Sequence, residues 1–210
     1  MFEFQLVKIQ REMPMLLKII ESTIQSVYRE AEEITRTMRS DPLAGKREGY
    51  YLYWRMEHTI LRAVEEAGIK GVEAKAVRSG SSTYHLEICT PYAVIMVSHV
   101  HRNGDVPKKA NYRQKYVDQT FVQEVFPELS LFTPECSPLY VITHSYTPNN
   151  ISSAIVRIGR LAVDQSSWSC NYYLKDLISK AITTEEIVPS DAITVPEDVK
   201  RNSKIRLKKS

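Results

Sequence analysis

Three histidines and a glutamate in the middle of the chain are of the right types to form a metal site. His99 and His101 lie two residues apart in a strand-like segment, so their side chains face the same side of the strand. The expected pairing with the preceding strand adds His85 and Glu87 to that face. Three imidazoles can hold zinc and leave one position open for a water that Glu87 would activate. This pattern gives one functional hypothesis, a metal-dependent hydrolase or nuclease.

The same face also has a simpler interpretation. Two histidines at this spacing are common in strands, and Glu73, Lys75 and Glu87 form a charge ladder typical of a solvent-exposed sheet face. Glu73-Ala74-Lys75 resembles the Glu-x-Lys element of metal-dependent nucleases similar to restriction enzymes, which implies a carboxylate on Mg²⁺ and a lysine beside the attacking water. That element needs an acidic residue on a preceding strand, whereas Glu73 lies in the first strand after a helix. We therefore favour the charge ladder.

A basic segment around a tyrosine, residues 102–115, is the best anion-binding segment within the body of the chain. Lys108, Lys109 and Arg113 could contact phosphates where a helix begins, and Tyr112 could stack on a base. The simpler alternative is a solvated loop that caps a helix. Residues 46–55 also mix aromatic and basic side chains, but aromatic residues that open a helix are more often core anchors, and we favour that interpretation.

Positive charge is concentrated at the end of the chain. The chain carries a net charge of +3, and six basic residues lie in its last eleven positions, so residues 1–199 carry −3. The acidic stretch that begins at residue 183 is typical of a linker. The basic tail is therefore the clearest expected contact for a nucleic acid or another polyanion. Its basic residues are Lys200, Arg201, Lys204, Arg206, Lys208 and Lys209.

Composition excludes several classes of protein. A hydrophobic content of 43% and a charged content of 25% are ordinary for a globular domain. Cys89, Cys136 and Cys170 are scattered and lack Cys-x-x-Cys spacing, which argues against a disulfide framework and against a cysteine zinc site. No apolar run is long enough to span a bilayer, and the first residues do not resemble a secretory signal. These features predict a cytoplasmic protein.

Apolar spacing predicts two helices before any clear strand. Residues 2–9 fit a short strand and a helix equally well. From Pro14 to Met38 apolar residues recur every three or four positions, which predicts a helix of about 25 residues. Its apolar stripe covers either this chain's own sheet, which we favour, or a second copy of the helix in an oligomer. A second helix is expected from Tyr53 to Ala67, ending at Gly68.

The middle of the chain alternates in the manner of strands. Pairing Lys75 with Glu87 across a three-residue loop, residues 80–82, places the apolar residues of both strands on one face. A second three-residue loop, residues 90–92, would continue this face through Val94 and Met96 and put His85 on the face of His99. Later segments predict a helix capped by Asn111, two strands and a last helix. These segments are residues 111–125, 139–147, 154–161 and 173–181.

These patterns predict one α+β domain, residues 1–182, with residues 183–210 as acidic linker and basic tail. Its core is a mostly antiparallel sheet of about five strands packed by helices, with a long N-terminal helix and a C-terminal extension. The leading functional hypothesis is a non-catalytic binding or regulatory protein that acts in an oligomer or larger assembly and binds nucleic acid or another anionic partner. That hypothesis needs no cofactor, whereas the hydrolase or nuclease needs a divalent metal.

Overall fold

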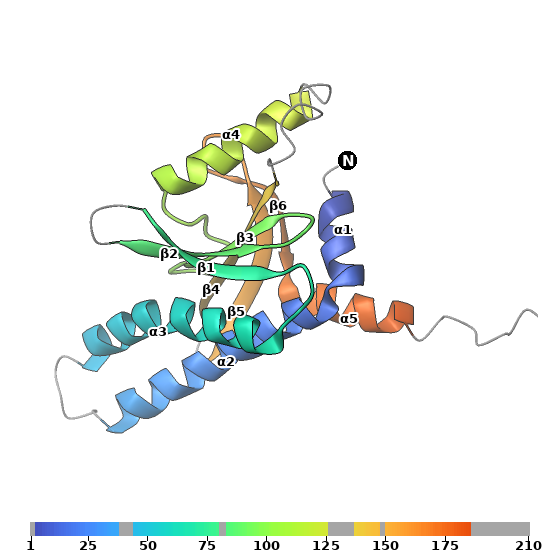
Figure 1. Ribbon diagram of the computed structural model, residues 1–210. Helices are drawn as coiled ribbons and strands as arrows, with labels where there is room; N and C mark the ends of the chain where they lie inside the picture. The colour runs from blue at the N-terminus through green and yellow to red at the C-terminus, as the bar shows by residue number, and fades with distance from the viewer. Residues whose placement is uncertain (1–2, 38–43, 80–82, 126–136, 148–149, 186–210) are drawn as a thin grey trace, which may run out of the picture.

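The computed structural model describes residues 3–37, 44–79, 83–125, 137–147 and 150–185, and it has the expected α+β fold (Figure 1). Within these residues, a curled sheet of six strands in the order β1-β2-β3-β4-β5-β6 is packed by five helices. Every neighbouring pair is antiparallel except β3 and β4, which are parallel because α4 connects them. The elements are α1 (Glu3–Glu12), α2 (Pro14–Thr37), α3 (Ala44–Ala67), β1 (Glu73–Arg78), β2 (Tyr84–Cys89), β3 (Val94–His99), α4 (Asn111–Val125), β4 (Leu139–Thr147), β5 (Asn150–Leu161), β6 (Trp168–Tyr173) and α5 (Leu174–Glu185).

Helices cover both faces of the sheet, and each face has its own apolar core. The larger core joins α1, α2, α3 and α5 to residues such as Ile88, Ile95 and Ile142 of the sheet. The smaller core places Val117 of α4 against Val94 and other residues of the opposite face. Figure 1 shows α4 on one side of β2 and β3, with α2 and α3 on the other.

The long helix α2 packs within its own chain. Its buried side chains include Ile20, Ile24 and Val27, which are fully covered, and the helix lies against α3 and β5. The side chain of Gln25 also donates to the carbonyl of Ala154 at 2.8 Å and accepts from its amide at 2.9 Å, so it ties α2 to β5. The preferred interpretation of the apolar stripe is confirmed, and this stripe is not free to join a second helix.

Several elements differ from the expected boundaries. Residues 3–12 form a helix, α1, which resolves the choice between strand and helix. Helix α3 begins nine residues before the expected Tyr53, at Ala44. The expected alternation of Ala154 to Leu161 is only part of β5, which begins at Asn150.

The sixth strand, β6, was not expected from the sequence. It runs over Trp168–Tyr173, and the last helix therefore begins at Leu174 rather than Tyr173. Helix α5 continues through Glu185, past the expected domain end at residue 182. The basic tail, residues 200–210, lies outside the described residues.

The first expected strand pairing is confirmed and the second is wrong. Lys75 pairs with Glu87, as expected. However, Cys89 pairs with Val94 and Ile88 pairs with Ile95, which leaves the four residues 90–93 between the paired positions. The Thr90 hydroxyl closes this longer turn, because it accepts from the amide of Ala93 at 2.9 Å and donates to its carbonyl at 2.8 Å. The shift by one residue moves all of β3 to the other face.

This correction separates the histidines that the expected register places on one face. Ile95, Val97 and His99 share the α2 and α3 face of the sheet, whereas His85 and Glu87 face α4. β2 and β3 are paired only from Glu87 to Cys89 and from Val94 to Met96. Beyond these residues the two strands diverge, and there His85 and His99 can approach each other although they belong to different faces.

Candidate functional site

A cleft opens where β2 and β3 separate. It has a volume of about 670 Å³ and lies between α3, residues 83–85 at the start of β2, residues 97–101 at the end of β3, and residues 105–113 that lead into α4. This volume is within the range of about 300–1,000 Å³ usual for ligand sites. We call it the histidine cleft, because four of the five histidines of the chain line it: His85, His99, His101 and His144.

His144 is the most deeply buried histidine of this set, and it was not among the residues expected at a site. The parallel pairing of β3 and β4 places it directly beside His99. Its Nδ1 lies 2.9 Å from the hydroxyl of Tyr28 on α2. Burial lowers the pKa of His144 to about 3, and burial together with the neighbouring His101 lowers the pKa of His99. Both rings are therefore neutral near pH 7 and contribute hydrogen-bonding groups rather than charge.

His85 is held on the α4 side by a network of polar side chains. Its Nε2 lies 2.9 Å from one carboxylate oxygen of Glu87, and the other oxygen accepts from the hydroxyl of Tyr116 at 2.9 Å. The ring of Tyr112 stacks on His85, with centroids 3.9 Å apart and planes at 19°. Glu87 and Tyr112 therefore hold His85 directly, and Tyr116 acts through Glu87. Its Nδ1 is buried and has no hydrogen-bond partner among the described residues.

The cations of the histidine cleft come from the segment that enters α4. Lys108 and Lys109 are exposed, whereas Arg113 is only 2% exposed. The guanidinium of Arg113 donates to the carbonyl of Lys108 and lies 5.4 Å from the centroid of the Tyr112 ring, and its Nε has no partner in the described part of the chain. The three cations outnumber the two carboxylates of the lining, Asp105 and Glu57. The cleft is thus suited to an anion.

A smaller pocket adjoins the histidine cleft and shares residues with it. It has a volume of about 380 Å³ and is lined by Trp54, His58 and Leu61 of α3 together with residues of β1 and β2. We call it the aromatic pocket. Glu57, Thr83, Tyr84 and His85 line both cavities, so they form a shared wall. The fifth histidine, His58, therefore lies beside the other four.

The aromatic pocket contains a residue whose environment differs from the expected one. Trp54 was expected among the core anchors of residues 46–55, but it is 73% exposed. Tyr51, one turn earlier, does pack against the core and donates to Glu30 at 2.9 Å. The helical spacing explains the difference. Residues three positions apart differ by about 60° around the helix axis, so Trp54 can lie outside a narrow apolar stripe that includes Tyr51.

Glu57 has an altered acidity. Burial raises its pKa from the usual 4.5 to about 7, and a hydrogen bond with the backbone of Leu86 opposes part of this shift. No pattern in the sequence points to this residue, since Glu57 is one of several glutamates in α3. Near pH 7 this carboxyl is partly protonated, which further favours an anion in the cleft.

We expect Glu57→Gln to remove part of the pH dependence of stability. The folded protein keeps a proton on Glu57 that the unfolded chain releases above pH 4.5, so its stabilising effect is complete below pH 4.5 and is lost as the pH rises to about 7. At pH 8 the variant should gain about 2 kcal/mol over wild type, and at pH 4 it should match it. Urea unfolding at several pH values measures this, with exposed Glu66→Gln as the control. A constant difference between variant and wild type at every pH would contradict the assignment.

The structure brings together seven of the predicted site residues, but not as a metal centre. Lys108, Lys109, Tyr112 and Arg113 line the histidine cleft, as do His85, His99 and His101. In the described part of the chain, no three His, Cys, Asp or Glu side chains are grouped so that they could hold a metal ion. Both oxygens of Glu87, the expected general base, already accept hydrogen bonds. The metal site stays a prediction without geometric support.

Other predicted residues lie elsewhere or are not described. Glu73 and Lys75 are exposed on the edge strand β1, outside both cavities. Tyr112, expected to stack on a base, already stacks on His85. Cys89 and Cys170 are half-buried and form no disulfide within the described part of the chain. Cys136 and the six basic residues of the tail lie outside the described residues.

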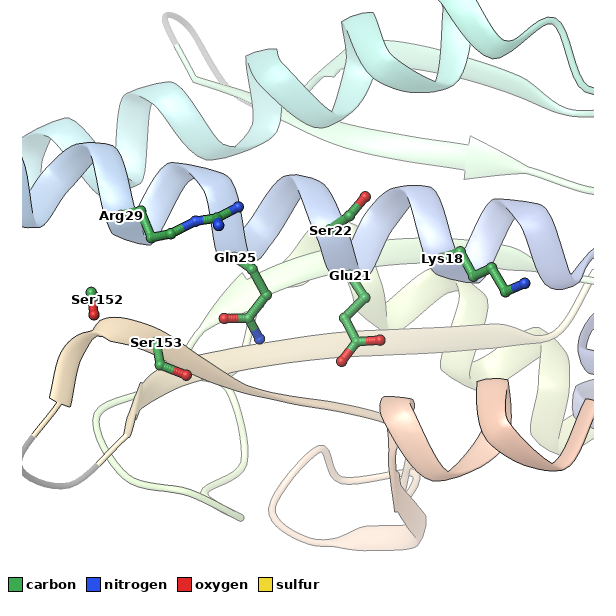
Figure 2. A pocket seen from close by; sticks show the side chains of 7 residues that line it. All are labelled: Lys18, Glu21, Ser22, Gln25, Arg29, Ser152 and Ser153. Carbon is green, nitrogen blue, oxygen red and sulfur yellow. The ribbon is translucent and has the colours of Figure 1, made fainter. Parts of the chain in front are cut away.

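A third cavity lies between α2 and the start of β5 (Figure 2). Figure 2 shows Lys18, Glu21, Gln25 and Arg29 along the helix, with Ser152 and Ser153 across from them. Its charges are mixed, and Gln25 is already bonded to the backbone of β5. This groove is therefore a weaker site than the histidine cleft.

Comparison with protein families, with curated proteins and with solved structures finds no match for this chain. Within the described residues, none of the helices is both long and apolar enough to cross a membrane.

Proposed function

We propose that this protein binds nucleic acid, and that Lys108, Lys109 and Arg113 contact its phosphates in the histidine cleft. The observation that carries the proposal is the grouping of these three cations along one cavity, where they outnumber the carboxylates. Phosphate contacts supply most of the affinity in nucleic-acid binding, and Lys and Arg are the residues that make them.

The positions of the three cations fit this role. Arg113 is buried and its guanidinium is fixed by the carbonyl of Lys108 and by the Tyr112 ring, so little entropy would be lost when it binds. Lys108 and Lys109 are exposed and can follow a flexible backbone. In this proposal the basic tail, residues 200–210, adds further phosphate contacts and the protein acts by binding rather than by catalysis.

Replacing the two lysines tests the proposal. We expect Lys108→Ala/Lys109→Ala to bind a single-stranded 20-nucleotide probe about 10- to 100-fold more weakly at roughly 0.1 M salt, because two phosphate contacts are lost. The slope of log affinity against log salt should fall by about 1.4, which is two contacts at about 0.7 each for a single strand. Fluorescence anisotropy over a salt series measures both quantities.

The control has the same change of charge at another place. Arg62 and Lys70 are exposed and line neither cavity, so Arg62→Ala/Lys70→Ala should bind nearly as wild type does. A chain ending at residue 199 gives the separate contribution of the tail. Equal losses in the two double variants would reduce the proposal to a general effect of net charge, and an unchanged affinity of Lys108→Ala/Lys109→Ala would reject the cleft as the site.

A further inference from the structure

The aromatic pocket presents rings to solvent beside the cationic lining of the histidine cleft. Among the described residues, four large hydrophobic side chains are exposed, and two of them, Trp54 at 73% and Tyr84 at 56%, line this pocket. The ring of Trp54 is nearly parallel to that of His58, with planes at 7° and centroids 6.5 Å apart. Exposed apolar side chains that are gathered together and bordered by polar residues are typical of ligand-binding grooves and interaction sites.

The two cavities together match the two chemical parts of a nucleotide. A base offers an aromatic face that stacks on Trp, Tyr or His, and its phosphate needs cations a short distance away. Here the aromatic pocket supplies Trp54, Tyr84 and His58, and the histidine cleft supplies the cations. The shared wall adds hydrogen-bonding groups, because Glu57 and His85 line both cavities.

We propose that the aromatic pocket receives an unpaired base of a single-stranded nucleic acid whose backbone lies in the histidine cleft. This inference rests on the proposed function and names the class of partner. In a duplex both faces of each base are covered by its neighbours, so only an unpaired base can stack on a protein ring. A purely apolar ligand or a simple polyanion would use one of the two cavities and leave the other unused.

The residue that separates these cases is Trp54. We expect Trp54→Ala to bind a single-stranded 20-nucleotide probe about tenfold more weakly, whereas Trp54→Phe, which keeps a ring, recovers most of the affinity. Binding of inorganic polyphosphate, which has charge but no bases, should be unchanged in both variants. A duplex of the same length should bind wild type more weakly than the single strand, and Trp54→Ala should not weaken it further.

Tryptophan emission gives a second readout. The chain has two tryptophans, and Trp168 is partly buried and donates to the carbonyl of Gly104 at 3.0 Å. Stacking of a base on exposed Trp54 should therefore quench emission when the single strand binds, and this quenching should be lost in Trp54→Ala. Met15→Ala removes another exposed large side chain, 58% exposed, and should change neither affinity nor quenching.

The outcomes separate the two proposals. If Trp54→Ala binds the single strand as wild type does, or loses affinity for polyphosphate to the same extent, the aromatic pocket does not receive a base and this inference is overturned, while phosphate binding in the cleft stands. If wild type binds neither the oligonucleotide nor polyphosphate, the proposed function fails and the inference fails with it. Because Trp54 is mostly exposed, its removal leaves the apolar core intact.

Discussion

We expect Gly159→Ala to lower the free energy of unfolding by about 3 kcal/mol or more, the typical upper range for overpacking. A Cβ at position 159 would lie 2.3 Å from the carbonyl oxygen of Cys170, 2.9 Å from a ring carbon of Trp168 and 3.0 Å from Cα of Asn171. The first and third atoms belong to the backbone of β6, which pairs with β5 at this point. The added methyl group could be accommodated only if the two strands moved apart.

This substitution connects the fold to the site. Trp168 packs over Gly159, and its Nε1 donates to the carbonyl of Gly104, just before the segment 105–113 that lines the histidine cleft. Separation of β5 and β6 would therefore loosen this anchor as well. We expect the affinity for an oligonucleotide to fall together with stability.

Chemical denaturation measures the effect, and another glycine provides the comparison. Gly68 has a φ of +57°, and no atom of the described residues lies within 4 Å of the place that an added methyl group would take. Gly68→Ala should therefore cost only the strain of a left-handed backbone, about 1 kcal/mol. We expect the melting temperature to fall by roughly 10 °C in Gly159→Ala and by only a few degrees in Gly68→Ala. Equal effects would show that β5 and β6 approach less closely at this point.

Local sequence patterns predicted the helices and strands that have one buried face and one exposed face. The apolar spacing from Pro14 predicted α2 because one face of this helix meets α3 and the sheet while the other faces solvent. The first strand pairing followed from matching Lys75 with Glu87, and the structure has this pair. In each case the periodicity of the sequence reflects one buried face.

The periodicity of apolar residues was insufficient where a single side chain determines the length of a turn. The extra residue in the turn at 90–93 depends on the hydroxyl of Thr90, and no periodicity reveals whether a threonine closes a turn of three or four residues. Strand β6 was missed because both of its faces are only partly buried, so polar and apolar residues do not alternate clearly along it.

Among the residues of the candidate site, those that are neighbours in the sequence could be predicted, and those brought together only by the fold could not. Lys108, Lys109 and Arg113 could be predicted because they are clustered in the sequence. His144 and Glu57 could not, because they reach the cleft from β4 and α3, which only the folded topology brings together. The raised pKa of Glu57 depends on burial beside β2, which is a property of packing and not of its neighbours in the chain.

Glu87 lines neither cavity, but it is bonded to His85, which lines both, so its loss should weaken the shared wall. We expect Glu87→Ala to destabilise the protein by about 3 kcal/mol, because His85 Nε2 and the Tyr116 hydroxyl would both lose their acceptor, at about 1–3 kcal/mol for each buried group left unpaired. Burial and the bond to Glu87 raise the pKa of Tyr116, so its hydroxyl stays protonated and needs an acceptor at all ordinary pH values. Urea unfolding measures the loss.

Two further variants distinguish the network from a general effect of charge. Glu87→Gln keeps the shape and one acceptor oxygen, so it should cost about 1 kcal/mol. Glu73→Ala removes an exposed carboxylate from the neighbouring strand and should change stability by less than about 0.5 kcal/mol. If hydrogen bonds to Glu87 stabilise this part of the fold, the loss of unfolding free energy must be larger for Glu87→Ala than for Glu87→Gln. Equal losses in Glu87→Ala, Glu87→Gln and Glu73→Ala would contradict this explanation.

The same substitution should also reach the ligand site. Tyr112 stacks on His85, and Arg113 follows Tyr112 in α4. If Glu87→Ala lets the His85 ring move, the first residues of α4, including Arg113, would lose this contact with β2. Oligonucleotide affinity should therefore fall in Glu87→Ala under conditions where the variant is still fully folded, and recover in Glu87→Gln. A folded Glu87→Ala protein with unchanged affinity would show that the cations of the cleft are positioned without the His85 network.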